Sequence, residues 1–126
     1  MEDKKYVKLN DVEAYKIAFR LSNDIWTIVM KWEFFNKDTL GKQFVRAVDS
    51  VSANLAEGFG RYGKKDKIKF YRYAIGSVFE ALDWNEKAKK RGLLSKNEYD
   101  EILVKLKELP RSINTLIKIT NLKLTI

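Results

Sequence analysis

The sequence predicts an all-α protein, an up-and-down antiparallel four-helix bundle, and three observations support this class. Apolar residues recur every three or four positions along four segments, as on the buried face of a helix. Only one proline and six glycines interrupt the 126 residues. The connections are short, so successive helices are expected to be antiparallel neighbours. The length predicts one domain, residues 1–126, whose core needs no metal or disulfide.

The first two helices are predicted over about residues 11–33 and 39–59. Asp11 is expected to cap the first, and Asp38 or Thr39 the second, after a loop at 34–37. The apolar face of the first helix carries Ile17, Leu21, Ile25, Ile28, Val29 and Trp32. The apolar face of the second carries Leu40, Phe44, Val48, Val51 and Leu55.

The third helix is predicted over about residues 64–91, between a glycine-rich turn and Gly92. Gly58, Gly60 and Gly63 predict that turn, because glycine tolerates the backbone conformations that end helices. The buried side of the third helix is expected to carry Ile68, Tyr71, Ile75, Val78, Leu82 and Trp84.

The fourth helix is predicted over about residues 96–121 and opens with a capping box of Ser95 and Glu98. Pro110 lies inside it and removes the hydrogen bond to the Leu106 carbonyl, so we expect a kink or a split there. Its apolar face carries Ile102, Leu106, Leu109, Ile113 and Leu116.

The second predicted helix carries no charge from Val51 to Ala56, and beside its apolar stripe it has a stripe of small and polar residues, Ala47, Ser50, Asn54 and Arg61. Two interpretations stay open: the helix is central in the bundle, or this face packs against another subunit. We expect a homo-oligomer held together partly by the surface of Ser50, Ala53, Asn54 and Ala56.

Composition argues against several classes of function. The chain has no cysteine, which excludes disulfides and thiol chemistry and suits a cytoplasmic location. It has no histidine, so the usual general base and zinc ligand are missing. We therefore expect no enzyme, no catalytic residue, no cofactor and no metal. No signal peptide or membrane span is recognisable, so neither secretion nor a membrane partner is expected.

One enzymatic alternative remains, a Mg²⁺-dependent all-α nucleotide hydrolase. Glu80 and Asp83 share one helical face, and Glu57 and Glu86 are candidates for the same carboxylate site. Ordinary ion pairing with neighbouring lysines explains the same residues more simply.

A basic cluster opens the third predicted helix, and the net charge of +8 favours an anionic partner such as RNA or DNA. The candidate nucleic-acid-binding residues are Arg61, Lys64, Lys65, Lys67, Lys69 and Arg72. Aromatic residues nearby offer base-stacking surfaces, although helical spacing places Tyr71 in the core. A solvated surface and a scaffold that binds an acidic protein are the alternatives.

Three nearby segments together resemble a known signature: Asn54–Arg61, Lys64–Lys65 and Phe70–Glu80. It is the signature of the four-helix-bundle proteins encoded in intervening sequences of bacterial 23S ribosomal RNA genes, the S23 family. Further matches at Ala14, Tyr15, Gln43, Arg46 and Ala47 extend the resemblance over residues 14–119. This chain departs from the family pattern at Phe35–Asn36, where Phe-Pro is usual, and at Gly63.

The resemblance implies a bacterial, non-enzymatic homo-oligomer, typically a pentamer, and kinship with accessory subunits that bind reverse transcriptase and nucleic acid. Its motif residues are Arg46, Asn54, Glu57, Gly58, Arg61, Gly76 and Glu80. Spacing places Asn54, Glu57 and Arg61 on one helical face, where we expect an interhelical polar network with Glu80, or else a ligand-binding cluster. Gly76 predicts close approach of another backbone.

Overall fold

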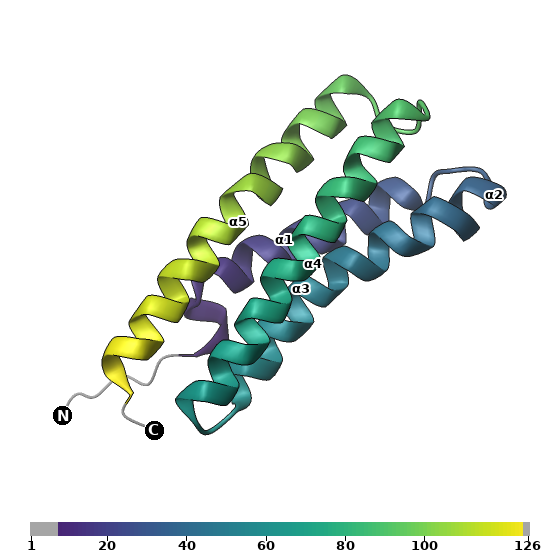
Figure 1. The fold of residues 1–126 in the computed structure, drawn as a ribbon. Coiled ribbons are helices and arrows are strands. Elements are labelled where there is room, and N and C mark those ends of the chain that lie inside the picture. Colours follow the sequence, from purple (N-terminus) through teal and green to yellow (C-terminus); the bar gives the residue numbers. More distant parts are fainter. Residues whose placement is uncertain (1–7, 125–126) are drawn as a thin grey trace.

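The computed structural model describes residues 8–124 and shows a four-helix bundle (Figure 1). The long helices are α1 (Glu13–Val29), α3 (Lys42–Gly60), α4 (Lys64–Lys90) and α5 (Lys96–Lys123). Short connections make consecutive long helices antiparallel, with α3 packed between α1 and α4, and α5 against α4 and α1. The described residues contain no strand, so the predicted fold class is confirmed.

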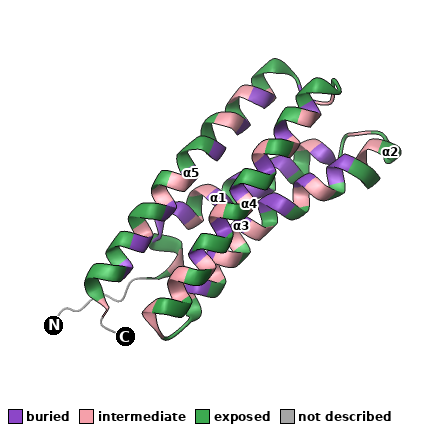
Figure 2. Cartoon of the chain, in the orientation of Figure 1, coloured by how far each residue is buried: buried purple, intermediate pink, exposed green. Residues whose placement is uncertain are grey.

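One core fills the space between the four helices, and the buried residues form stripes along their inner faces (Figure 2). Leu21, Ile25 and Val29 of α1 are buried there, as the apolar periodicity predicts. The predicted core residues that are only partly buried are Ile17, Ile28, Trp32, Ile68, Ile75, Leu82, Trp84 and Leu116.

The start of α1 differs from the prediction. Asp11 belongs to a separate 3₁₀ turn, η1 (Leu9–Asp11), and its carboxylate accepts a hydrogen bond from the Lys8 backbone N–H at 3.0 Å. Val12, whose side chain cannot accept a hydrogen bond, occupies the N-cap of α1. Asp11 therefore satisfies the backbone of the preceding turn rather than the first turn of α1.

The segment predicted as a loop between the first two helices is helical. After the N-cap at Glu33, α2 (Phe34–Asn36) continues through a π-helical turn, η2 (Lys37–Gly41), directly into α3. Asp38 and Thr39 lie inside this segment and cap nothing. Gly41 permits the wide turn to press on α1, because a Cβ atom there would lie 2.6 Å from Cγ1 of Val29.

The glycine-rich turn lies where the sequence predicts it, but Gly58 has a different role from the predicted one. It is a buried residue inside α3, two residues before that helix ends at Gly60. A Cβ atom on Gly58 would lie 2.7 Å from Cε1 of Tyr71 and 2.9 Å from the Lys67 carbonyl oxygen. Gly58 therefore permits close contact between α3 and α4, while Gly63 is the N-cap of α4, with ordinary φ.

The predicted signals around the last connection are confirmed. Gly92 adopts a φ of 74° just beyond α4, a conformation that favours glycine. The Ser95 side chain accepts a hydrogen bond from the Glu98 backbone N–H at 3.1 Å, and the Glu98 carboxylate accepts one from the Ser95 N–H at 2.9 Å. This capping box starts α5.

Pro110 does not split α5, which is continuous from Lys96 to Lys123. A proline inside a helix costs about 3 kcal/mol through the lost hydrogen bond and steric conflict. Leu106, Leu109 and Ile113 around it are fully buried in the core, and their packing offsets this cost and keeps the helix continuous. The expected split is therefore wrong.

Candidate nucleic-acid interface

A basic pocket forms where the first turns of α4 lie beside the last turns of α5, with a volume of about 660 Å³. Its lining residues are Lys64, Lys65, Ile68, Lys69, Arg72 and Asn121. Antiparallel packing of the two helices places Asn121 beside the start of α4, although the two segments are far apart in sequence. Four of the six predicted nucleic-acid-binding residues thus line one pocket, which we call the α4/α5 pocket.

The charge of this pocket is only slightly compensated. Lys69 forms an ion pair with Asp66 at 3.6 Å, and both side chains are about half exposed. Within residues 8–124, Lys64, Lys65 and Arg72 form no ion pair. Exposed cations grouped in this way attract phosphates, because binding releases the counterions around a nucleic acid.

Lys67, a fifth predicted residue, lies outside the pocket and is engaged elsewhere. Its ammonium group donates a hydrogen bond to the Phe59 carbonyl oxygen at 2.7 Å and lies 5.5 Å from the centroid of the Phe59 ring. Partial burial lowers the pKa of Lys67. A cation bonded to a carbonyl in the last turn of α3 stabilises the C-terminus of that helix, so we assign Lys67 a structural role.

Arg61, the sixth predicted residue, faces the junction of α3 and α4. Its guanidinium forms an ion pair with Glu57 at 2.8 Å and a longer one with Asp66 at 4.0 Å. The guanidinium carbon also lies 4.7 Å from the centroid of the Phe70 ring. Arg61 therefore has compensated charge and orders the turn between α3 and α4.

The predicted interhelical polar network does not form within the described chain. Asn54 donates to the Ser50 carbonyl of its own helix at 2.9 Å, and Glu80 accepts from Nε1 of Trp84 at 3.3 Å. Only the Glu57–Arg61 pair remains of the expected set, and it extends to Asp66 instead of Glu80. Local partners along the same helix satisfy Asn54 and Glu80, so neither side chain reaches across.

Two further motif residues, Arg46 and Gly76, lie on the surface. Beyond the adjoining turns of α4, residues 8–124 place no atom within 4 Å of a Cβ built on Gly76, so the expected close approach of another backbone is not seen in the described part of the chain.

The carboxylates of the hydrolase alternative point to separate partners. Asp83 binds the Lys87 ammonium at 2.6 Å, Glu80 binds Trp84, and Glu86 accepts a hydrogen bond from the Tyr99 hydroxyl. That hydrogen bond raises the pKa of Tyr99. The described part of the chain holds no group of three or more acidic residues suited to a metal ion.

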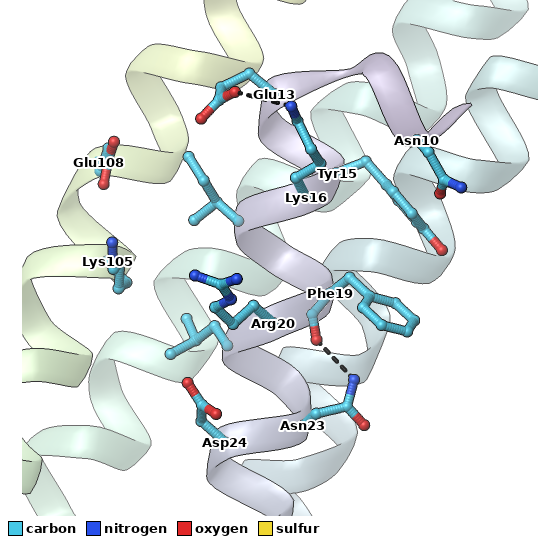
Figure 3. A pocket seen from close by; sticks show the side chains of 12 residues that line it. Asn10, Glu13, Tyr15, Lys16, Phe19, Arg20, Asn23, Asp24, Lys105 and Glu108 are labelled. Atoms are coloured by element: carbon cyan, nitrogen blue, oxygen red, sulfur yellow. Dashed lines mark hydrogen bonds and ion pairs between the residues drawn. The ribbon is translucent and has the colours of Figure 1, made fainter. Parts of the chain in front are cut away.

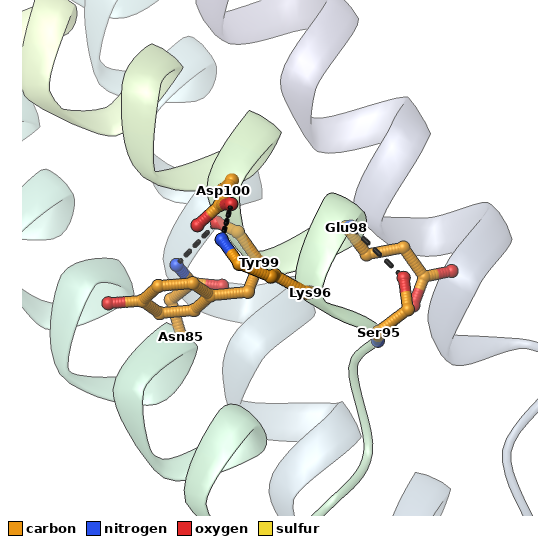
Figure 4. A network of polar contacts seen from close by, with 6 residues as sticks. All are labelled: Asn85, Ser95, Lys96, Glu98, Tyr99 and Asp100. Atoms are coloured by element: carbon orange, nitrogen blue, oxygen red, sulfur yellow. Dashed lines mark hydrogen bonds and ion pairs between the residues drawn. The ribbon is translucent and has the colours of Figure 1, made fainter.

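Sequence reasoning missed a buried polar residue between α4 and α5. Asn85 is fully buried among apolar neighbours, and its Nδ2 donates a 3.4 Å hydrogen bond to the Tyr99 carbonyl (Figure 4). Its Oδ1 has no partner within the described residues. Its spacing could have identified it: Asn85 lies four residues after Ala81 and three before Ala88, which are both buried, so helical periodicity places it on the core side of α4.

A second groove, of about 690 Å³, lies between α1 and α5 (Figure 3). Its rim mixes both signs of charge, with Glu13, Lys16, Arg20 and Asp24 on α1 and Lys105 and Glu108 on α5. Glu13 and Lys16 pair at 3.6 Å. A rim of mixed charge attracts polyanions less than the α4/α5 pocket does.

Two uncharged surfaces are exposed on the bundle. Phe19 and Trp26 of α1 and Met30, the C-cap residue of that helix, have exposed fractions of 53%, 52% and 47%. On α3, Ala53 is exposed, while Ser50, Asn54 and Ala56 are half-buried. The surface predicted as a subunit contact is therefore partly exposed in the single chain.

The fold and the α4/α5 pocket together define a helical-bundle protein with a basic pocket between its last two helices. The model of a protein family described as "23S rRNA-intervening sequence protein" matches residues 10–115, so the chain belongs to that family and the predicted resemblance is confirmed.

A solved structure supports the fold. The chain is similar to a protein of unknown function from the S23 ribosomal protein family of Bacteroides thetaiotaomicron, with a TM-score of 0.74 and 18% sequence identity. The match covers 83% of this chain and 98% of the other, and at this identity it shows a shared fold alone. Among curated proteins, none matches this chain. None of the helices in residues 8–124 combines the length and the apolar character of a membrane span.

Proposed function

We propose that this protein is a non-enzymatic homo-oligomer that binds nucleic acid, preferably RNA, through the α4/α5 pocket. The observation that carries the proposal is the convergence of Lys64, Lys65, Lys69 and Arg72 on one pocket with a single weak ion pair among them. We favour RNA over other polyanions because the chain belongs to a family described as 23S rRNA-intervening sequence protein.

Repetition of the pocket in an assembly strengthens this proposal. Several weak phosphate contacts on one assembly raise the overall affinity without any new interaction. The uncharged surfaces on α1 and α3 differ from each other, and a ring of subunits requires such a heterologous contact. The proposed assembly is a pentamer located in the cytoplasm, where a chain without cysteine meets no redox constraint.

The proposed absence of catalysis rests on the acidic side chains. All four carboxylates considered for a metal site already have a partner. Glu80, Asp83 and Glu86 bind side chains of α4 or α5, and Glu57 forms an ion pair with Arg61. The test is a nucleotide hydrolysis assay with Mg²⁺. Hydrolysis by wild type that is abolished in a folded Glu80→Gln variant would contradict this part of the proposal.

The test of binding is a salt titration with RNA that compares wild type with a triple variant, Lys64→Ala, Lys65→Ala and Arg72→Ala. For single-stranded ligands the logarithm of the binding constant falls with the logarithm of salt by about 0.7 per phosphate neutralised, and by about 0.9 for B-DNA. The variant should bind more weakly and with a shallower slope, because it contacts fewer phosphates.

A matched control loses the same charge elsewhere. Lys31, Lys105 and Lys107 are exposed and lie outside the α4/α5 pocket, so their triple alanine variant should keep the wild-type slope nearly unchanged. Equal losses in both variants would show a general charge effect, and unchanged binding in both would favour a scaffold for an acidic protein, such as an accessory subunit of a reverse transcriptase. The exposed apolar residues of α1 are the feature that favours this second function.

A further inference from the structure

Tyr62 occupies the turn between α3 and α4, immediately before the basic row of the α4/α5 pocket. Its side chain is 84% exposed, the largest fraction among the exposed large hydrophobic residues described. Successive Cα atoms are about 3.8 Å apart, so the Cα of Tyr62 lies within about 8 Å of that of Lys64. The row from Lys64 to Arg72 extends about 12 Å along α4.

The other aromatic rings near this turn are already engaged. Lys67 lies over Phe59, while Arg61 and Lys69 lie 4.7 and 5.3 Å from the centroid of Phe70. Tyr73 packs edge-on against Phe70, with centroids 5.5 Å apart, and Tyr71 is buried.

No ring or cation in residues 8–124 stacks on Tyr62. Tyr62, whose Cα lies within about 8 Å of that of Lys64, is thus an aromatic residue near the basic row whose ring faces are open to a ligand.

We propose that Tyr62 stacks on an unpaired base of a nucleic acid whose phosphates lie in the α4/α5 pocket, so that single-stranded or looped segments are the preferred ligand. This inference rests on the proposed function and adds the class of ligand. Bases in a duplex are stacked on one another and cover their own faces, whereas an unpaired base offers a free face to an aromatic side chain. Every base has such a face, so the contact tolerates any sequence.

The experiment measures binding of labelled single-stranded RNA without self-complementarity, and of its duplex, to wild type, Tyr62→Ala and Tyr62→Phe over a range of salt. Base stacking on an aromatic residue predicts that Tyr62→Ala weakens single-strand binding by about fivefold or more. The duplex affinity should stay the same, since its bases are covered. Tyr62→Phe should behave as wild type because it keeps the ring.

The salt dependence separates stacking from phosphate contact. Tyr62→Ala removes no charge, so its binding curve should be displaced to lower affinity at every salt concentration with an unchanged slope. Phe79→Ala is the matched control, because Phe79 is 60% exposed on α4 but lies about 22 Å from Lys64 along the helix axis. It should bind both ligands as wild type does.

Two results overturn the inference in distinguishable ways. Unchanged single-strand affinity in Tyr62→Ala, together with weaker binding in the pocket triple variant, removes the stacking role and leaves the proposed function. Absence of RNA binding by wild type removes both. Circular dichroism and the assembly mass verify that each variant is folded, as expected for a side chain so exposed.

Discussion

Gly58 of α3 lies directly against the ring of Tyr71 of α4, so close that a Cβ atom at Gly58 would stand 2.7 Å from Cε1 of that ring. The Lys67 carbonyl oxygen, 2.9 Å from the same position, belongs to the backbone and cannot turn aside. The close approach of α3 to α4 at this point therefore requires glycine at position 58.

Gly58→Ala should therefore destabilise the bundle. Overpacking costs about 1–3 kcal/mol, and the better helix propensity of alanine offsets about 1 kcal/mol of it. Gly60→Ala is the control, because nothing lies within 4 Å of its Cβ position. Denaturant unfolding should show a lower midpoint for Gly58→Ala alone, and equal midpoints would contradict the tight contact.

Lys67→Ala should lower stability by about 1 kcal/mol, because it removes the cation at the C-terminus of α3 and its hydrogen bond to Phe59. Its effect on the salt dependence of RNA binding should be smaller than that of Lys65→Ala. Thermal unfolding and salt titration measure the two effects separately. A large change in slope with unchanged stability would return Lys67 to the binding surface.

The stability of the bundle should fall as the pH rises from 10 to about 12. Burial raises the pKa of Tyr71 to about 12 from an ordinary value of 10.0. Between these values the unfolded chain loses the Tyr71 proton while the folded protein keeps it. Ionisation therefore stabilises the unfolded state, and the free energy of unfolding falls. Tyr71→Phe should show a shallower loss of stability across this window than wild type. Identical slopes would mean that Tyr71 does not contribute.

Ala53→Glu should dissociate the proposed oligomer, because a carboxylate buried in a subunit contact loses its hydration without a partner. Light scattering coupled to size exclusion should report a mass above 14.8 kDa for wild type and near 14.8 kDa for the variant. Ala53→Ser is the conservative control. A wild-type mass of one chain at micromolar concentration would remove the interface.

Gly76→Ala distinguishes an exposed helix surface from a subunit contact. Gly76 lies in the middle of α4 with open space at its Cβ position. Alanine there should raise the free energy of unfolding by about 1 kcal/mol, and the unfolding midpoint with it. If the backbone of a second chain covers Gly76 in the assembly, the same substitution should instead lower the assembly mass. Circular dichroism with light scattering reports both results.

Apolar periodicity was enough to predict the four helices and most of their buried faces. The capping box of Ser95 and Glu98 and the helix end at Gly92 were also predictable, because each depends on contacts within a few residues. The predictions that failed at Asp11, Asp38 and Thr39 concern helix starts, where neighbouring turns compete for the same polar side chains.

The candidate site was predictable as a set of residues but not as an arrangement. Lys64, Lys65, Lys67 and Lys69 are equivalent in sequence, yet the fold turns Lys67 toward Phe59 and leaves the others beside α5. Asn121 joins the pocket only through the antiparallel pairing of α4 and α5, which no local pattern reveals.

By itself, the sequence determined the helical class, the family, the net charge of +8 and the absence of histidine and cysteine. These properties depend on residue types and on spacing along one helix. Only the tertiary structure decided that Gly58 receives the ring of Tyr71, that Pro110 stays within an unbroken helix and that Asn121 lies beside the lysines of α4. The reason is physical: packing and charge pairing join segments distant in sequence, and their free energies outweigh the local preferences that a sequence displays.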